Sequence, residues 1–224
     1  MGVSGGPDLI QNGLVLCLDA SDKNSYPGSG TTWFDVSGNN NHGTLTNSPA
    51  FSTSGSGCIS FDGVDDFVTM NSSTSLTTST PTLIITCTNN SGTILAKGGY
   101  GSHWNYGLTG VTSTTFKARN NNADLTSPSF SSSTSAFNIY AMVWNGSAVL
   151  FYRNGIYGGS VSTNYSPSAQ NSLYLRIGCA WNNNTSANVE FYSGKVSLVQ
   201  IYNRALSADE IQQNANAQKS RFGL

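Results

Sequence analysis

Three aspartates lie close together in the segment FDGVDDF, at Asp62, Asp65 and Asp66. Calcium in proteins binds about six to eight oxygen atoms, so this group of carboxylates is a candidate calcium site. The same residues also fit a tight turn, in which Asp62-Gly63 forms the bend and a later carboxylate accepts backbone amides. Both interpretations stay open: calcium is possible, and the sequence requires no cofactor.

A second group of residues suits sugar binding. Tyr100, Trp104 and Tyr106 lie in one glycine-rich segment, and Trp181 precedes an asparagine-rich loop. Sugars stack on aromatic faces that have amide groups beside them, so these four residues are candidate glycan ligands. In the alternative interpretation, at least two of the rings cover the ends of a hydrophobic core.

The acidic residues do not form a hydrolytic pattern. Retaining glycosidases need two carboxyl groups about 5–5.5 Å apart, which on a strand means acidic residues two or four positions apart. The chain has two glutamates. Glu190 has no acidic residue at those spacings, and Glu210 lies where a helix cap is expected. His42 and His103 lie in loop segments, and no G-x-S-x-G motif occurs, so we expect no catalytic residues and no enzyme activity.

The composition restricts the class of protein. Of 224 residues only 9% are charged, and the formal net charge is −1. Nucleic-acid binding requires clustered Lys and Arg, and ten scattered cations do not supply it. No apolar run is long enough to span a membrane, and the first residues lack the pattern of a secretory signal. We therefore expect neither a nucleic-acid partner nor a membrane segment.

The cysteines are far apart in sequence. They are Cys17, Cys58, Cys87 and Cys179. Without a C-x-x-C motif, zinc and thioredoxin-type sites are excluded. We expect four buried free thiols, and a Cys17–Cys58 disulfide stays open.

Short apolar or alternating runs recur along the chain, separated by loops rich in Gly, Asn, Ser and Pro. The predicted strands are 14–19, 57–61, 67–70, 82–88, 93–97, 106–108, 115–119, 136–144, 148–153, 173–179 and 194–202. Many short strands at this spacing indicate an all-β sandwich or jelly roll. Asn154-Gly155 between two strands predicts a hairpin.

One helix is predicted near 208–218, because Ser207 and Glu210 form a capping box. No linker divides the chain. We expect a short N-terminal arm at 1–12 and one domain at 13–224.

Several motifs now resemble a known family. SFDG-x-DD begins at Ser60, YNRALS-x-x-EI begins at Tyr202, and the middle contains YAMVWNGSAVLFYRNGIYGG and LYLRIGCAW. Together they are similar to laminin-G-like domains with the concanavalin-A-like lectin fold, in the versions found in virion proteins of tailed bacteriophages, particularly cyanophages. The resemblance covers nearly the whole chain. It implies an antiparallel jelly roll of two sheets, with no catalysis by default.

The resemblance leads to three functional hypotheses. The first is a non-enzymatic phage virion protein, a head decoration or a fibre or tail module. It would fold in the host cytoplasm and lie on the virion surface, where it would contact other virion proteins or a second copy of itself. Host-surface glycans are a further candidate ligand. The second is a free carbohydrate-binding module. The third, a glycoside hydrolase, is disfavoured by the carboxylate pattern.

Overall fold

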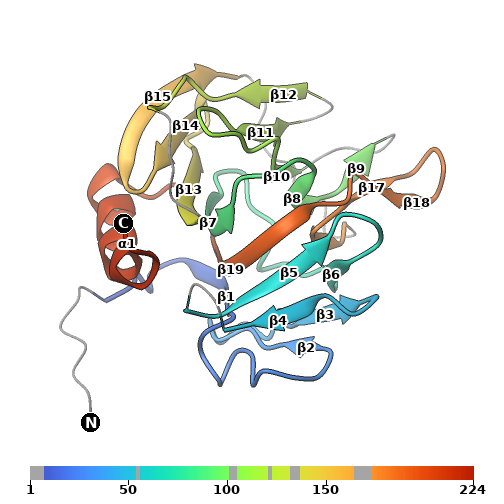
Figure 1. The fold of residues 1–224 in the computed structure, drawn as a ribbon. Coiled ribbons are helices and arrows are strands. Elements are labelled where there is room, and N and C mark those ends of the chain that lie inside the picture. Colours follow the sequence, from blue (N-terminus) through green and yellow to red (C-terminus); the bar gives the residue numbers. More distant parts are fainter. Residues whose placement is uncertain (1–7, 54–55, 101–104, 121–122, 132–136, 164–172) are drawn as a thin grey trace, which may run out of the picture.

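The computed structural model describes residues 8–53, 56–100, 105–120, 123–131, 137–163 and 173–224. In this part of the chain two antiparallel sheets pack face to face, and helix α1 (Ala208–Phe222) lies against the outside of one of them (Figure 1). This confirms the predicted all-β jelly-roll sandwich with a C-terminal helix. The domain limits of 13–224 stay a prediction. Part of the predicted arm lies against the helix, where the Ile10 amide donates to Asn214 Oδ1 at 2.9 Å.

The sheet that contacts the helix is called sheet A. Its strands, in spatial order, are β15 (Ile156–Ser162), β14 (Ala148–Arg153), β13 (Phe137–Trp144), β7 (Thr82–Thr88), β19 (Ser193–Tyr202), β5 (Cys58–Asp62) and β4 (Ala50–Ser52), and β1 (Leu14–Asp19) also pairs with β19. All eight residues of β13 are buried. The segment FNIYAMVW is therefore almost entirely apolar rather than alternating, with Asn138 as the polar exception, because both faces of this strand are covered.

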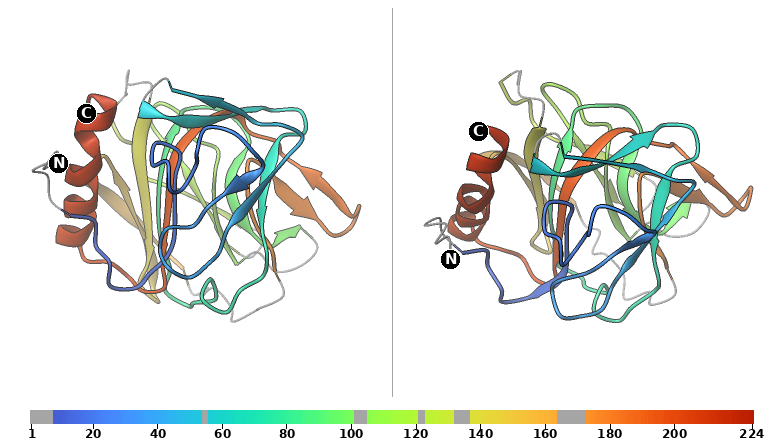
Figure 2. Two further views of the ribbon diagram at one scale, coloured as in Figure 1. Left: turned by 90° about the horizontal axis from the view of Figure 1, so that it is seen from below. Right: turned by 60° about the horizontal axis from the view of Figure 1, so that its bottom comes forward.

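The opposite sheet is called sheet B. Its strands, in spatial order, are β12 (Ala123–Thr126), β11 (Lys117–Asn120), β10 (Tyr106–Thr109), β8 (Thr93–Lys97), β16 (Leu175–Ile177), β6 (Phe67–Met70), β3 (Gly43–Thr46) and β2 (Thr32–Trp33). A small third sheet, sheet C, contains β18 (Ala187–Val189), β17 (Ala180–Asn182) and β9 (Gly99–Tyr100). The β17–β18 ribbon and α1 lie on opposite sides of the molecule (Figure 2).

The main core fills the space between sheets A and B and includes both Trp33 and Trp144. A second apolar cluster joins α1 to the outer face of sheet A through Ile211 and Ala215. A third and much smaller cluster joins sheet C to the outer face of sheet B through Ala96 and Ala180. The outer face of sheet A is thus covered where α1 lies, and among the described residues the outer face of sheet B has an apolar contact with sheet C.

The predicted hairpin is present between β14 and β15. Arg153 pairs with Ile156, and Asn154 and Gly155 have φ values of 55° and 82°, as a type I′ turn requires. A Cβ atom at position 155 would lie 2.9 Å from the Ala215 Cβ. Gly155 therefore allows both the turn and the close approach of the helix.

The predicted capping box is also present. Glu210 N donates to Ser207 Oγ at 3.3 Å, and Ser207 N donates to Glu210 Oε2 at 2.8 Å. The helix runs beyond the predicted residue 218, because Arg221 pairs with Asp19 at 2.8 Å and Gly223 ends the helix in the left-handed conformation. These contacts fix the chain end to β1.

Replacing Ser207 by alanine should lower the free energy of unfolding by about 1 kcal/mol, because the amide of Glu210 loses its acceptor. Ser207→Asp, which keeps an acceptor at the cap, should be close to the wild type. Urea unfolding of the three proteins measures the difference. Equal loss in both variants would show that the cap does not stabilise this helix.

The four cysteines are buried free thiols, as predicted, and Cys17 and Cys58 form no disulfide. Burial raises the pKa of the Cys17 thiol to about 12, so this thiol is protonated and unreactive at neutral pH. Among the described residues, no helix has both the length and the apolar character needed to cross a membrane.

Candidate functional site: the outer face of sheet B

One row of side chains crosses the outer face of sheet B from strand to strand. Its members are cross-strand partners, in the order Asp124, Arg119, Gly107, Ala96, Arg176, Thr69 and Thr44. Their neighbours along the strands, such as Leu95, Leu175 and Val68, belong to the core between the sheets. Because side chains alternate along a strand, the row faces away from that core.

Arg176 is the centre of an aromatic group, here called the Arg176 cluster, which consists of Tyr174, Arg176 and Trp181. The guanidinium carbon lies 4.8 Å from the centroid of the Trp181 ring and 5.5 Å from that of Tyr174. Trp181 is half-buried, and Tyr174 is 46% exposed. Cation–π contacts of this kind hold the guanidinium between the rings.

Polar atoms around the cluster are only partly satisfied. The indole N–H of Trp181 donates to Asn183 Oδ1 at 2.9 Å. Arg176 Nε and Asn188 Oδ1 are buried and have no hydrogen-bond partner. Asn188 is the cross-strand partner of Trp181, so both side chains lie on one face of the ribbon. An unsatisfied donor and an unsatisfied acceptor therefore lie close to the exposed rings.

Further along the row, Glu190 and Asp124 lie in a charged hollow of about 380 Å³. Glu190 Oε2 accepts from Arg119 Nη2 at 2.5 Å and from Thr93 Oγ1 at 2.6 Å. Asp124 pairs with Arg119 at 3.1 Å and with Lys117 at 3.5 Å. Arg119 therefore joins two carboxylates that are far apart in the sequence, Asp124 and Glu190, and both are paired with cations.

At the other end of the row, a polar hollow of about 380 Å³ lies beside Thr44. Its lining comes from Asn39, Asn40, Asn41, His42, Thr44, Asn71, Ser72 and Ser73. His42 Nδ1 accepts from the Asp35 amide at 3.0 Å, which fixes the ring in a lining made mostly of asparagine amides and hydroxyl groups. The predicted loop position of His42 agrees with this structural role.

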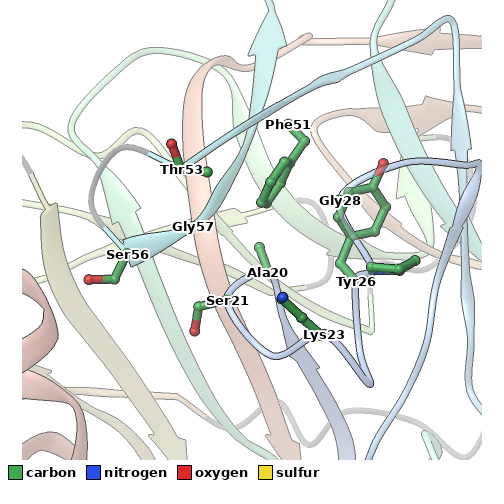
Figure 3. Close-up of a pocket in the computed structure, with 10 residues that line it drawn as sticks. Ala20, Ser21, Lys23, Tyr26, Gly28, Phe51, Thr53, Ser56 and Gly57 are labelled. Atoms are coloured by element: carbon green, nitrogen blue, oxygen red, sulfur yellow. The ribbon is translucent and has the colours of Figure 1, made fainter.

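A smaller hollow of about 220 Å³ lies between the loop after β1 and the segment before β5. Figure 3 shows the rings of Tyr26 and Phe51 on one side and the hydroxyls of Ser21, Thr53 and Ser56 on the other. The two rings contact each other at a centroid distance of 5.3 Å. Tyr26 is only 4% exposed, so its ring supports the hollow and offers little face to a ligand.

Comparison with known proteins decides the family. A profile described as the concanavalin A-like lectin/glucanases superfamily matches residues 61–212, which is most of the chain. The chain belongs to this superfamily. No curated protein sequence matches it significantly.

Solved structures with the superfamily fold resemble the chain at low sequence identity. Domain 4 of AbnA, an extracellular arabinanase from Geobacillus stearothermophilus, was solved with arabinotriose; it has a TM-score of 0.69 and 14% identity, covering 90% of this chain and 98% of that one. The binding domain of botulinum neurotoxin DC, solved with SialylT, has a TM-score of 0.65 and 13% identity, covering 93% and 52%.

A Trypanosoma rangeli sialidase has a TM-score of 0.66 and 18% identity, covering 93% of this chain but only 34% of the sialidase chain. At these identities the likeness shows the fold, which this superfamily member shares with sugar-binding domains and with parts of glycosidases. None of these matches concerns a phage protein.

The predicted aromatic residues do not form one group. Trp104 and the side chain of Tyr100 lie outside the described residues. Tyr106 is fully buried in the core, and its hydroxyl donates to the Leu76 carbonyl at 2.8 Å. Tyr106 therefore offers no surface to a ligand, because its position in β10 points between the sheets. Trp181 lies on the outer face of sheet B.

Sequence reasoning missed two residues of the cluster, Tyr174 and Arg176. A signal was available in the segment LYLRI, because residues two apart on a strand share a face. Leu173, Leu175 and Ile177 mark the apolar positions, which leaves Tyr174 and Arg176 together on the other side.

The three predicted aspartates are together in the structure, with ligand oxygens within 4.8 Å of one another. Several of these oxygens organise the turn. Asp62 Oδ1 accepts from Val64 N at 2.8 Å and from Asp65 N at 3.3 Å, and Asp66 Oδ2 accepts from Asp62 N at 3.1 Å. Burial raises the pKa of Asp66, and backbone hydrogen bonds lower that of Asp62. These contacts account for the carboxylates of Asp62 and Asp66 as turn residues.

Substitution of Asp62 distinguishes a role of its carboxylate in the turn from a role in calcium binding. Asp62→Asn keeps the amide acceptor, so we expect an unchanged melting temperature, whereas Asp62→Ala should lower it by a few degrees. Calcium and EDTA should leave all three proteins unaffected. A calcium-dependent rise in the wild type that disappears in Asp62→Asn would instead establish a metal site, since calcium needs the charged oxygens.

Proposed function

We propose that this domain is a non-enzymatic glycan-binding module and that the Arg176 cluster is its binding site. The observation that carries the proposal is the grouping of the exposed Tyr174 ring and the half-buried Trp181 ring against the Arg176 guanidinium, on the outer face of sheet B of a lectin fold. Structures with the same fold were solved with arabinotriose and with SialylT, which supports a sugar ligand.

The chemistry of the cluster suits a sugar ring. Aromatic faces bury the C–H face of a pyranose, and N–H groups at the edge of the guanidinium donate to its oxygens. Arg176 Nε and Asn188 Oδ1 are buried beside the rings without a hydrogen-bond partner, and leaving such atoms unpaired costs free energy.

The carboxylates support the non-enzymatic part of the proposal. Glu190 and Asp124 are joined by Arg119. Glu210 is engaged by Arg204 at 2.5 Å and by the helix cap, and this hydrogen bond to Arg204 lowers its pKa to about 2. A general acid in a glycosidase needs a raised pKa. Arg204 acts in the opposite direction at Glu210, since it stabilises the ionised form.

A panel of neutral and acidic oligosaccharides tests the proposal. Isothermal titration should give binding of at least one class with a dissociation constant in the micromolar to millimolar range, without release of reducing ends on prolonged incubation. Absence of binding across the panel would contradict the glycan-binding function. Turnover of any saccharide would contradict the non-enzymatic assignment and leave binding intact.

That this chain is a structural component of a phage particle is a separate hypothesis. It is supported by the sequence resemblance to virion proteins, and the fold is equally suited to a free binding module. Mass spectrometry of purified particles tests it: a stoichiometric presence of this chain supports a decoration or fibre role, and its absence from the particles would overturn that role.

A further inference from the structure

The arginines of this chain differ in how their charge is satisfied. Arg119, Arg204 and Arg221 each pair with a carboxylate. Arg153 donates to the backbone carbonyls of Ser113 and Ser131. Arg176 makes no ion pair and donates no hydrogen bond to any residue that the structure describes.

The unpaired charge of Arg176 is also partly desolvated. Its Nε is buried, and the rings of Tyr174 and Trp181 lie over the guanidinium. Burial lowers the pKa of this group. Partial burial of a cation without an anion or an acceptor is costly, and the other four arginines avoid this cost through protein partners. Rings above a guanidinium leave its in-plane N–H groups directed outward.

We propose that Arg176 binds the carboxylate of an acidic sugar, and that the domain therefore prefers saccharides carrying sialic or uronic acid over their neutral counterparts. This inference rests on the glycan-binding function proposed above. A planar guanidinium donates two parallel N–H···O bonds to one carboxylate. The adjacent rings of Tyr174 and Trp181 exclude water from that contact and bind the sugar ring itself.

The charge distribution favours a carboxylate over a heavily sulfated polymer. Polyanionic chains are bound by clusters of Lys and Arg, and this chain has a net charge of −1. Arg119 of the row and Lys117 on the same strand are already paired with Glu190 and Asp124. A single unpaired guanidinium matches a single carboxylate in charge and in shape.

Titration with matched ligands tests the inference. 3′-Sialyllactose and its methyl ester differ only in the charge of the carboxyl group, as do a trigalacturonate and its methyl ester, and lactose 3′-sulfate presents a sulfate on the lactose core. We expect at least tenfold tighter binding of one carboxylated ligand than of its neutral counterpart. Arg176→Gln should reduce that ratio to near one, and Arg176→Lys, which keeps the charge but not the fork, should lose most of it.

Lys117→Gln is the matched control, since it removes one cation from the same face of sheet B, where Lys117 is 40% exposed. This variant should keep the full preference, and thermal unfolding should show that all variants are folded. Equal binding of acidic and neutral ligands by the wild type, or tighter binding of the sulfate than of the carboxylate, would overturn the inference while leaving the glycan-binding function standing. Failure of every saccharide to bind would overturn both.

Discussion

Replacing Trp181 by alanine should weaken saccharide binding at least tenfold without unfolding the domain. The ring contacts the sugar and also supports Arg176, whose guanidinium lies 4.8 Å from its centroid. Loss of both effects exceeds the ~1.4 kcal/mol that corresponds to a factor of ten in affinity. Trp181 is half-buried on the short ribbon β17–β18, outside the main core, so its loss should cost little stability.

Two variants sharpen this experiment. Trp181→Phe keeps an aromatic face but loses the indole N–H that donates to Asn183, and we expect an intermediate affinity. Tyr157→Ala removes a ring that is 52% exposed on β15, an edge strand of sheet A, whereas Arg176 of the proposed site lies on sheet B. It should bind like the wild type. A similar loss in Tyr157→Ala and Trp181→Ala would place the binding surface elsewhere.

The largest stability effect is expected at Tyr106. Replacing it by alanine should lower the free energy of unfolding by about 3–5 kcal/mol, because a large buried ring is removed and a cavity is left. Tyr106 is fully buried in the main core, and burial raises the pKa of its hydroxyl far above the ordinary value. Urea unfolding followed by intrinsic fluorescence measures the change.

Tyr106→Phe serves as the control for the ring. It keeps the packing but leaves the Leu76 carbonyl without its donor, so the loss should be about 1 kcal/mol. Saccharide binding by this variant should equal that of the wild type. A stable Tyr106→Ala protein that no longer binds sugar would contradict the core position and would restore Tyr106 as a ligand-binding residue.

The fold is predictable from sequence where one local pattern decides it. Strands such as Leu14–Asp19 and Thr82–Thr88 have the bounds expected from their apolar runs. The turn at Asn154-Gly155 and the cap at Ser207 depend on neighbouring residues only, and both are present. Short edge strands are missed, as with AFS in β4 and ANV in β18, because three residues are too few to show a periodicity.

The site is less predictable, because it depends on contacts between distant segments. Glu190 is alone in its own segment, yet Arg119 from another strand neutralises it. Tyr106 has the residue type of a sugar ligand, and only the direction of its side chain in β10 places it in the core. Trp181 lies on an open face for the same kind of reason: β17 belongs to a ribbon outside the two main sheets. Strand register decides these roles, and composition does not.

The most direct test of the proposed site is an NMR titration of the isotopically labelled domain with its best-binding saccharide. The backbone amide resonances and the indole N–H resonances are monitored. We predict that the largest shifts fall on residues 174–183 and on the indole N–H of Trp181, with little change in the hollow beside Tyr26 and Phe51. Shifts confined to that hollow, or no shifts at a saccharide excess that saturates binding in calorimetry, would contradict a glycan site at the Arg176 cluster.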